Sequence, residues 1–188
     1  IEKVYKCRWM YDRLSAEGKK LFPNPYSSEN LAQEPLLSVL TLANNHAGMI
    51  AQNIESVLNQ KTNFPVQHII VDNASTDGTA EIIAGYAAQH PSITPLLFKK
   101  TAARGENLRV LFKQCLSTYA ALCDGDDYFT DPNKLQTQVN FLERNKDCAL
   151  CFHPVHVVYE DGSPSKLYPP ETLLPGGVRL RYSLNDLL

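Results

Sequence analysis

The stretch VQHIIVDNASTDGT, residues 66–79, contains the pattern that decides the fold. Its first half, 66–72, is an apolar run with the length of a buried β-strand. A short polar turn follows, and after it the apolar residues Ile82, Ile83, Tyr86 and Ala87 fall on one helical face. A strand that passes through a polar turn directly into a helix is the unit from which α/β sheets are built.

The same strand–helix unit recurs along the rest of the chain. Further strands are expected near 37–43, 94–98, 119–123 and 149–158. Between them, apolar residues repeat on helical faces: Ile50, Ile54, Val57 and Leu58, then Leu108, Leu111, Phe112 and Cys115, then Leu135, Val139 and Leu142. This alternation predicts an α/β fold whose sheet is mostly parallel and carries helices on both faces.

Composition divides the chain at about Pro35. Residues 1–35 are a charged, aromatic segment, expected to be helical, and then a linker rich in Pro, Ser and Asn. Residues 36–188 are expected to form the α/β domain. Because the chain starts at Ile1 and closes on RYSLNDLL, which resembles the opening of another helix, we expect a piece of a longer polypeptide.

Charge and hydropathy exclude several kinds of partner. The formal net charge is −2, so no basic surplus points to nucleic acid or to an anionic membrane surface. No apolar run in the sequence approaches the ~18–20 residues that span a bilayer, and no signal peptide is visible. We therefore expect no transmembrane segment and a cytoplasmic location.

A cluster of carboxylates follows the expected strand at 119–123. The stretch ALCDGDDYFTDP, residues 121–132, carries Asp124, Asp126 and Asp127. Like charges this close repel one another, and hard cations such as Mg²⁺ or Mn²⁺ prefer oxygen ligands. Gly125 would let the backbone turn tightly enough to bring two carboxylates toward one point. A divalent cation is therefore predicted here, with a solvated acidic turn as the alternative.

The polar turn after 66–72 has an alternative interpretation too, because Ser, Thr, Asp and Gly are common at helix starts. An EF-hand calcium loop is excluded, since the position that needs a bidentate Glu is Ala84. Ligands of open parallel sheets bind beyond the carboxyl ends of the strands. We therefore expect Asp72 and Asp126 to approach the same site, although they are far apart in sequence.

From Leu36 to about Gly162 the chain resembles a family 2 glycosyltransferase with the GT-A, Rossmann-like fold. The resemblance is carried by IAQNIESVLNQKTNFPVQHIIVDNASTDGT, by ALCDGDDYFTDPNKLQTQVNFLE and by CFHPVHVVYEDG, in this order. It implies a transfer of sugar from a nucleotide-diphosphate sugar to an acceptor hydroxyl, with inversion at the anomeric carbon. It also implies that the acceptor-binding half of the domain, which supplies the catalytic base, follows this chain.

The resemblance assigns roles to individual residues. DGDD corresponds to the family's DXD motif, in which Asp126 would ligate Mn²⁺ or Mg²⁺ on the donor diphosphate, with Asp127 assisting and Asp124 near the ribose. The nucleoside would be held by the loops after the first and second strands. Arg104 would approach the donor phosphates or sugar, with a solvated surface arginine as the alternative. The residues concerned are Asp72, Asn73, Asp77 and Asn44. No catalytic base is assigned.

Two departures from the family pattern affect nucleotide recognition. Ala43, Asn44 and Asn45 stand where the family commonly has Thr-Tyr-Asn, whose Tyr stacks near the base. Asp72-Asn73 replaces the usual acidic pair, and an amide can donate as well as accept a hydrogen bond. The sequence therefore leaves the nucleotide base, the sugar and the acceptor open, whether carbohydrate, lipid-linked or protein.

Two other functions are retained as alternatives. A nucleotidyltransferase also handles nucleoside phosphates with a metal, but it would normally carry a Gly-rich basic loop after the first strand. The residues there are Ala43, Asn44, Asn45 and His46. A non-catalytic nucleotide-sugar-binding or interaction module of a larger protein is the other alternative, because of the departures at Asn44 and Asn73.

Overall fold

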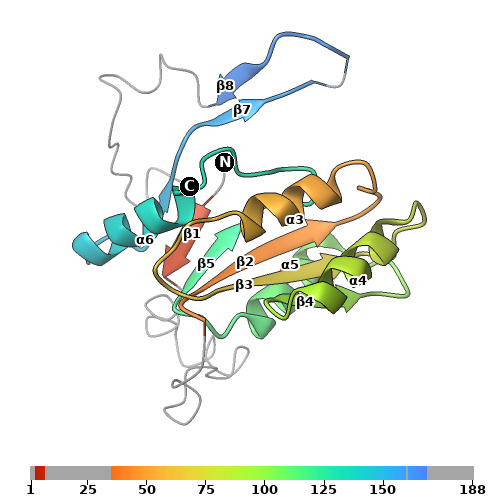
Figure 1. The fold of residues 1–188 in the computed structure, drawn as a ribbon, viewed down its shortest axis with the longest axis horizontal. Helices are drawn as coiled ribbons and strands as arrows, with labels where there is room; N and C mark the ends of the chain where they lie inside the picture. The colour runs from red at the N-terminus through yellow and green to blue at the C-terminus, as the bar shows by residue number, and fades with distance from the viewer. Residues whose placement is uncertain (1–2, 7–34, 160, 169–188) are drawn as a thin grey trace. The chain divides into compact units, whose positions relative to one another are not determined.

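The computed structural model describes residues 3–6, 35–159 and 161–168. The main unit, Lys3–Cys151, contains a six-stranded sheet with the order β4-β3-β2-β5-β1-β6 (Figure 1). Its strands are β1 (Lys3–Lys6), β2 (Leu37–Ala43), β3 (Val66–Asp72), β4 (Ile93–Leu97), β5 (Tyr119–Leu122) and β6 (Leu150–Phe152). The four strands that the sequence predicts between 37 and 123 are all present, with ends displaced by one residue at most.

The sheet is mostly parallel, as the alternation of strands and helices predicts. Strand β2 is central and pairs in parallel with β3 on one side and with β5 on the other, and β3 pairs in parallel with β4. Every residue of β2 is buried, which explains its continuous apolar sequence. In this register Ala43 lies beside Asp72, so β2 and β3 end together.

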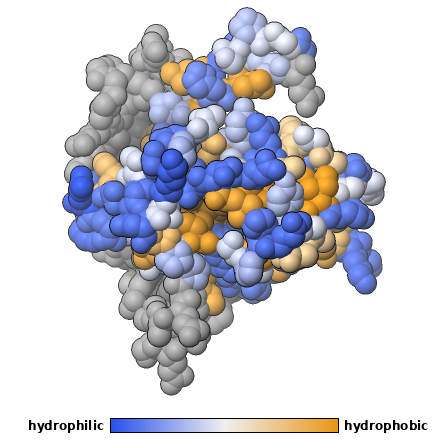
Figure 2. Space-filling view, in the orientation of Figure 1, coloured by the Kyte–Doolittle hydropathy of each residue, from blue (hydrophilic) through white to orange (hydrophobic). Residues whose placement is uncertain are grey.

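Helices cover both faces of the sheet, which confirms the predicted α/β layering. The helices are α3 (Ile50–Leu58), α4 (Thr79–Gln89), α5 (Arg104–Gln114) and α6 (Lys134–Arg144). Alternate strand residues such as Val39 and Ile70 pack with α3, α4 and α6, whereas Leu40 and Ile69 pack with α5. In Figure 1, α3 and α4 lie in front of the sheet and α5 behind it. Figure 2 shows mostly hydrophilic surface on the front face, with hydrophobic patches between.

Two sequence-based expectations are wrong in the described residues. Lys3–Lys6 is not part of an extension outside the sheet, because it pairs antiparallel with β5 and buries Val4 completely. Successive side chains of a strand point to opposite faces of the sheet, and Val4 lies in the cluster that contains Leu135 of α6, whereas Tyr5 lies against Phe112 of α5. The rest of the expected helical extension, 7–34, lies outside the described residues. No described helix is long and apolar enough to span a bilayer.

The expected long strand at 149–158 is the second error, because it is two strands. β6 ends at Phe152, and β7 (Val155–Val157) pairs instead with β8 (Lys166–Tyr168) in a separate antiparallel hairpin. Pro154 lies between them and has no N–H to donate to a ladder. The hairpin belongs to a second compact unit.

The buried His68 ties three strands together and is neutral. The single hydroxyl hydrogen of Thr41 on β2 goes to the carbonyl of Cys123, at 2.7 Å. His68 Nε2, 2.8 Å from that hydroxyl oxygen, must therefore carry the hydrogen that it donates to Thr41. Its Nδ1 is buried without a partner, and burial lowers the pKa of His68 from 6.5 to about 3.

This low pKa predicts a loss of stability at mildly acidic pH. Between the two pKa values the unfolded chain binds a proton that the folded chain does not, so stability falls as pH drops through 6.5. His68 alone should lower the free energy of unfolding by about 2 kcal/mol between pH 7.5 and pH 5. Chemical denaturation at both pH values measures it. His68→Gln keeps a donor for Thr41 and should remove most of this dependence of the unfolding free energy on pH. An equal pH dependence in both proteins would contradict the low pKa of His68.

Candidate functional site

Polar loops from four neighbouring strands meet at the carboxyl edge of the sheet. Asp72 ends β3 beside Ala43, the last residue of β2. On the other side of β2, the Gly125 N–H donates to the Leu42 carbonyl at 3.0 Å. The loop after β3 and the acidic turn after β5 therefore flank the same strand end. Asp72 and Asp126 thus belong to loops at one edge of the sheet, and their approach to a shared site stays a prediction.

The loop after β2 is fixed to the loop after β3 by hydrogen bonds. Asn44 Nδ2 donates to the carbonyl of Asn73 at 2.9 Å. The Asn45 N–H donates to Ser75 Oγ at 2.8 Å, and the Thr76 N–H donates to Asn45 Oδ1 at 2.9 Å. Asn45 has φ +57°, a conformation that Asn adopts more readily than most residues. The two loops therefore form one surface, in which Asn44 helps to hold the second loop.

Asp77 shapes the start of α4. One carboxylate oxygen accepts from the N–H and hydroxyl of Thr79, at 3.1 and 2.6 Å, and the other accepts from the Ala47 N–H at 2.9 Å. The hydrogen bond from the Thr79 hydroxyl is the main reason that the pKa of Asp77 lies below its usual value. Both carboxylate oxygens of Asp77 are therefore engaged within the protein. Asp77 stabilises the loop that is predicted to hold the nucleoside.

Asp72 is the buried carboxylate of the site. Only 1% of the residue is exposed, and its oxygens accept from the hydroxyl and the N–H of Ser75, at 2.5 and 3.0 Å. These bonds hold the side chain at the base of the loop. A carboxylate has about four lone-pair sites, so Asp72 retains capacity to accept further hydrogen bonds.

The hydrogen bonds of the Asn73 side chain account for an amide at the position where the family usually has a carboxylate. Its Nδ2 donates to the Ala102 carbonyl at 3.2 Å, and its Oδ1 accepts from the Ala102 N–H at 2.8 Å. The amide thus pairs with the backbone of the loop after β4 as a neighbouring strand would. A carboxylate could make only one of these bonds, because it has no hydrogen to donate to Ala102. The amide therefore docks the segment that leads into Arg104.

Arg104, the first residue of α5, reaches the acidic turn. Its Nη2 lies 2.6 Å from Asp124 Oδ2, and the side chains are 66% and 34% exposed. The hydrogen bond and charge of Asp124, with a smaller contribution from Asp126, raise the pKa of Arg104. An exposed pair of this kind contributes at most about 1 kcal/mol. Arg104 can therefore exchange Asp124 for another anion at little cost.

The DGDD segment is a tight turn around a glycine with no room for a side chain. The Asp127 N–H donates to the Asp124 carbonyl at 2.9 Å, which closes the turn. A Cβ on Gly125 would lie 2.7 Å from His46 Nδ1, 3.1 Å from Ala43 Cβ and 3.2 Å from Ala43 Cα. Gly125 is not among the residues with positive φ. The glycine is thus required for close packing over β2, not for the unusual backbone conformation that the sequence suggested.

The three carboxylates do not form a preassembled metal cage. No cluster of three or more His, Cys, Asp or Glu side chains capable of holding a metal exists in the described parts of the chain. Asp124 is paired with Arg104, whereas Asp126 is exposed at the tip of the turn. Mg²⁺ keeps several waters and commonly takes one or two carboxylates together with substrate phosphates. The residues therefore fit a cation that is held jointly with a diphosphate.

The sequence predicts helix α3, but sequence reasoning missed that this helix holds the acidic loop. Asn53, Ser56 and Gln60 point from α3 and its carboxyl end to residues 124–135. Gln60 donates to the Asp131 carbonyl at 2.9 Å and accepts from the Leu135 N–H at 3.0 Å. The available signal was a polar stripe at i, i+3 and i+7 beside the apolar stripe of the helix.

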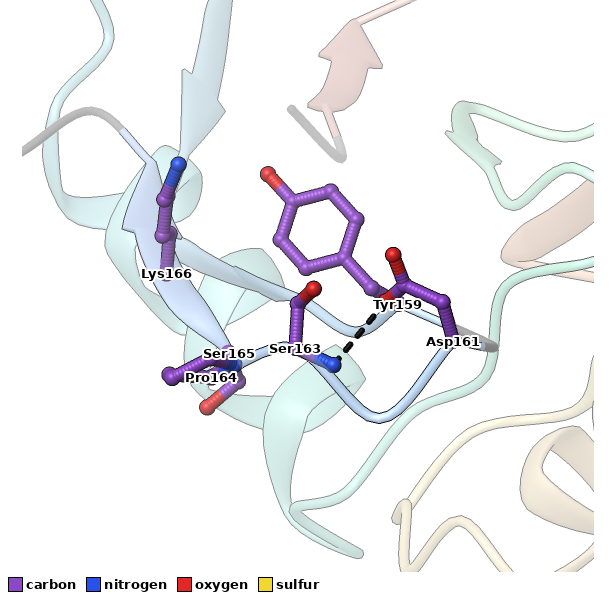
Figure 3. A pocket seen from close by; sticks show the side chains of 6 residues that line it. All are labelled: Tyr159, Asp161, Ser163, Pro164, Ser165 and Lys166. Carbon is purple, nitrogen blue, oxygen red and sulfur yellow. Dashed lines mark hydrogen bonds between the residues drawn. The ribbon is translucent and has the colours of Figure 1, made fainter.

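The hairpin unit carries a hollow of about 440 Å³ (Figure 3). It is lined by Tyr159, Asp161, Ser163, Pro164, Ser165 and Lys166. Within it the Ser163 N–H donates to Asp161 at 2.9 Å, and this bond is the main reason that the pKa of Asp161 lies below its usual value. None of these residues is a predicted site residue.

The family can now be stated from comparison with known proteins. Residues 38–180 match the family described as Glycosyl transferase family 2. The chain belongs to this family. It is 40% identical over 135 residues to the uncharacterized protein Rv1520 of Mycobacterium tuberculosis, a match that covers 71% of this chain and 39% of that protein.

Two solved structures share the GT-A fold with this family 2 chain. The structure of residues 1–349 of Staphylococcus aureus TarS has a TM-score of 0.52 and 23% identity, over 58% of this chain and 32% of that chain. The mannosyltransferase PcManGT of Pyrobaculum calidifontis has a TM-score of 0.51 and 21% identity, over 73% and 40%. This chain thus spans 39% of the Rv1520 protein, 32% of the TarS chain and 40% of the PcManGT chain in these comparisons.

The contact of Gly125 with β2 yields a prediction about stability. Gly125→Ala should lower the free energy of unfolding by about 1–3 kcal/mol, because the new methyl group overpacks against Ala43 and His46. Gly85→Ala in α4 is the matched control, since no atom lies within 4 Å of its Cβ position. It should stabilise the protein by about 0.5–1 kcal/mol. Chemical denaturation that finds both variants equally stable would contradict the close packing of the turn.

Proposed function

We propose that this chain is the donor-binding part of a glycosyltransferase that takes a nucleotide-diphosphate sugar together with Mn²⁺ or Mg²⁺. The proposal rests on one observation above all. Asn73 docks the loop that leads into Arg104, and Arg104 in turn contacts Asp124, so the loop after β3 is linked to the acidic turn. In this proposal the loop after β3 binds the nucleoside and the acidic turn binds the cation and the diphosphate, at one edge of the sheet.

Related structures support this choice of ligand. TarS has been solved with UDP and with UDP-GlcNAc, and PcManGT with GDP-Man and Mn²⁺. Family membership supports sugar transfer as the reaction class, and we propose that the acceptor group is a hydroxyl. We propose that inversion at the anomeric carbon accompanies the transfer, as in the family that the sequence resembles.

Each side of the site has a distinct task in the proposal. Asp72, at the base of the loop held by Asn44, Asn73 and Asp77, would accept hydrogen bonds from the nucleoside. Asp126 would hold the cation, with Asp127 assisting and Asp124 near the ribose. When bound, the cation supplies Lewis-acid stabilisation of charge on the departing diphosphate. Arg104 would move from Asp124 to a phosphate oxygen, because a guanidinium binds phosphate well and its present pair is weak.

A nucleotidyltransferase is disfavoured by the loop after β2. Such an enzyme would need backbone N–H groups there to surround a triphosphate. The N–H groups of Asn45, His46 and Ala47 already donate to the side chains of the loop after β3. They are therefore turned toward the protein. A module that binds a nucleotide sugar without catalysis uses the same contacts and differs only in turnover.

Calorimetry with UDP and GDP, each with Mn²⁺ or with chelator, tests the proposal. Binding of cation and diphosphate should be reciprocal, so Mn²⁺ should tighten one of the nucleotides by about 5- to 150-fold. Asp126→Asn should abolish most of this gain, because an amide oxygen is a weaker ligand for a hard cation. Asp147→Asn, beyond the carboxyl end of α6, is the matched control and should keep it. Equal affinities with and without Mn²⁺ in the unmutated protein would exclude the metal assignment.

A further inference from the structure

A buried amide on α3 holds both ends of the acidic turn. Asn53 is completely buried, and its Nδ2 donates to the Asp124 carbonyl at 2.9 Å and to the Asp127 carbonyl at 2.8 Å. The same nitrogen lies 3.3 Å from Cys123 Sγ. Asp124 and Asp127 are the first and last residues of the DGDD turn, so one side chain spans the whole turn.

The chemistry of the contact requires an amide nitrogen. An Asn side chain has two N–H hydrogens, and the two carbonyls can take one each. If the amide were reversed, its oxygen would face two carbonyl oxygens, and the Asp124 carbonyl would keep only the Asp127 N–H as a donor. The remaining atom, Oδ1, is buried and accepts no hydrogen bond. The side chain is therefore arranged entirely for donation to the turn.

The rest of α3 reinforces this attachment. Ser56 Oγ donates to the Asn53 carbonyl at 2.7 Å and accepts from the Phe129 N–H at 3.0 Å. Gly125 is packed against the end of β2. The turn is thus held from the helix and from the strand, while the exposed Asp126 projects from its tip. The position of that carboxylate depends on how the turn is seated on Asn53.

We infer that Asn53 is a positioning residue for the divalent cation, one that acts through the backbone of Asp124 and Asp127 and not by contact with the ion. The inference rests on the proposed function, in which Asp126 holds the cation on a diphosphate. Outer residues that orient a metal ligand commonly change metal affinity by about 10- to 100-fold when they are replaced. The same range is expected here for the metal-dependent part of nucleotide binding.

The test distinguishes the metal-dependent part of nucleotide binding from the binding of the nucleoside. Asn53→Leu has a similar size and no donor, and Asn53→Asp has the same shape but places a carboxylate against two carbonyls. Ile54→Val on the same helix is the matched control, because it removes one buried methyl group without touching the turn. Calorimetry with UDP and GDP gives the ratio of dissociation constants in chelator and in Mn²⁺. UMP and GMP in chelator report the nucleoside side alone, and thermal unfolding reports stability.

Both Asn53 variants should lose most of the metal-dependent ratio, by up to about 10- to 100-fold and by no more than the gain that the unmutated protein shows, while monophosphate affinity in chelator is unchanged. Ile54→Val should keep the ratio. Asn53→His, which retains one N–H donor near the same position, should restore part of it. Equal loss in Asn53→Leu and Ile54→Val would reduce Asn53 to a stability residue and overturn the inference. An unmutated protein in which Mn²⁺ has no effect would instead contradict the proposed function.

Hydrogen exchange gives a second readout that needs no ligand. Asn53→Leu should speed amide exchange at Gly125–Phe129 far more than Ile54→Val does. Exchange that is the same in both variants would show that Asn53 does not hold the turn, and would overturn the inference even if nucleotide binding is altered.

Discussion

The central strand β2 is the constraint on which the rest of the structure depends. It is buried along its whole length and pairs in parallel on both sides, so the chain must leave β3 and β5 at the same edge. Gly125 packs directly over the end of this strand. Two loops separated by about fifty residues in sequence are therefore neighbours of one strand end, and any ligand that touches both is held by the sheet itself.

Most polar groups in these loops have structural partners. Asp77 and Asn73 satisfy backbone donors and acceptors of neighbouring loops, and Asn53 satisfies the two carbonyls of the acidic turn. Asn73 and Asn53 are buried, and their amides would be costly to bury without these bonds. The exposed Asp126 and the weakly paired Arg104 are the exceptions, and they carry opposite charges suited to a cation and to a phosphate. The site thus has a rigid base and a small number of side chains left for ligand.

Sequence patterns predict the strands 37–43 and 66–72 well because a buried parallel strand is apolar throughout and a surface helix shows one apolar face. They do not predict that Lys3–Lys6 joins the sheet, since four residues contain little pattern, nor that Pro154 divides a strand. The acidic turn was found from charge alone. Its attachment to Asn53 was not, because an Asn within a helix gives no sign of which distant backbone it will meet.

The central claim is that the loops after β3 and β5 form one site for a nucleotide and a cation. The most direct measurement is paramagnetic broadening of amide resonances by Mn²⁺ in the presence of UDP or GDP. Broadening should require the nucleotide, should be strongest at Asp126 and Arg104, should extend to Ser75, and should fade toward Leu37 and Val66 at the opposite edge of the sheet. Broadening that is centred elsewhere, or that is unchanged by the nucleotide, would contradict the claim.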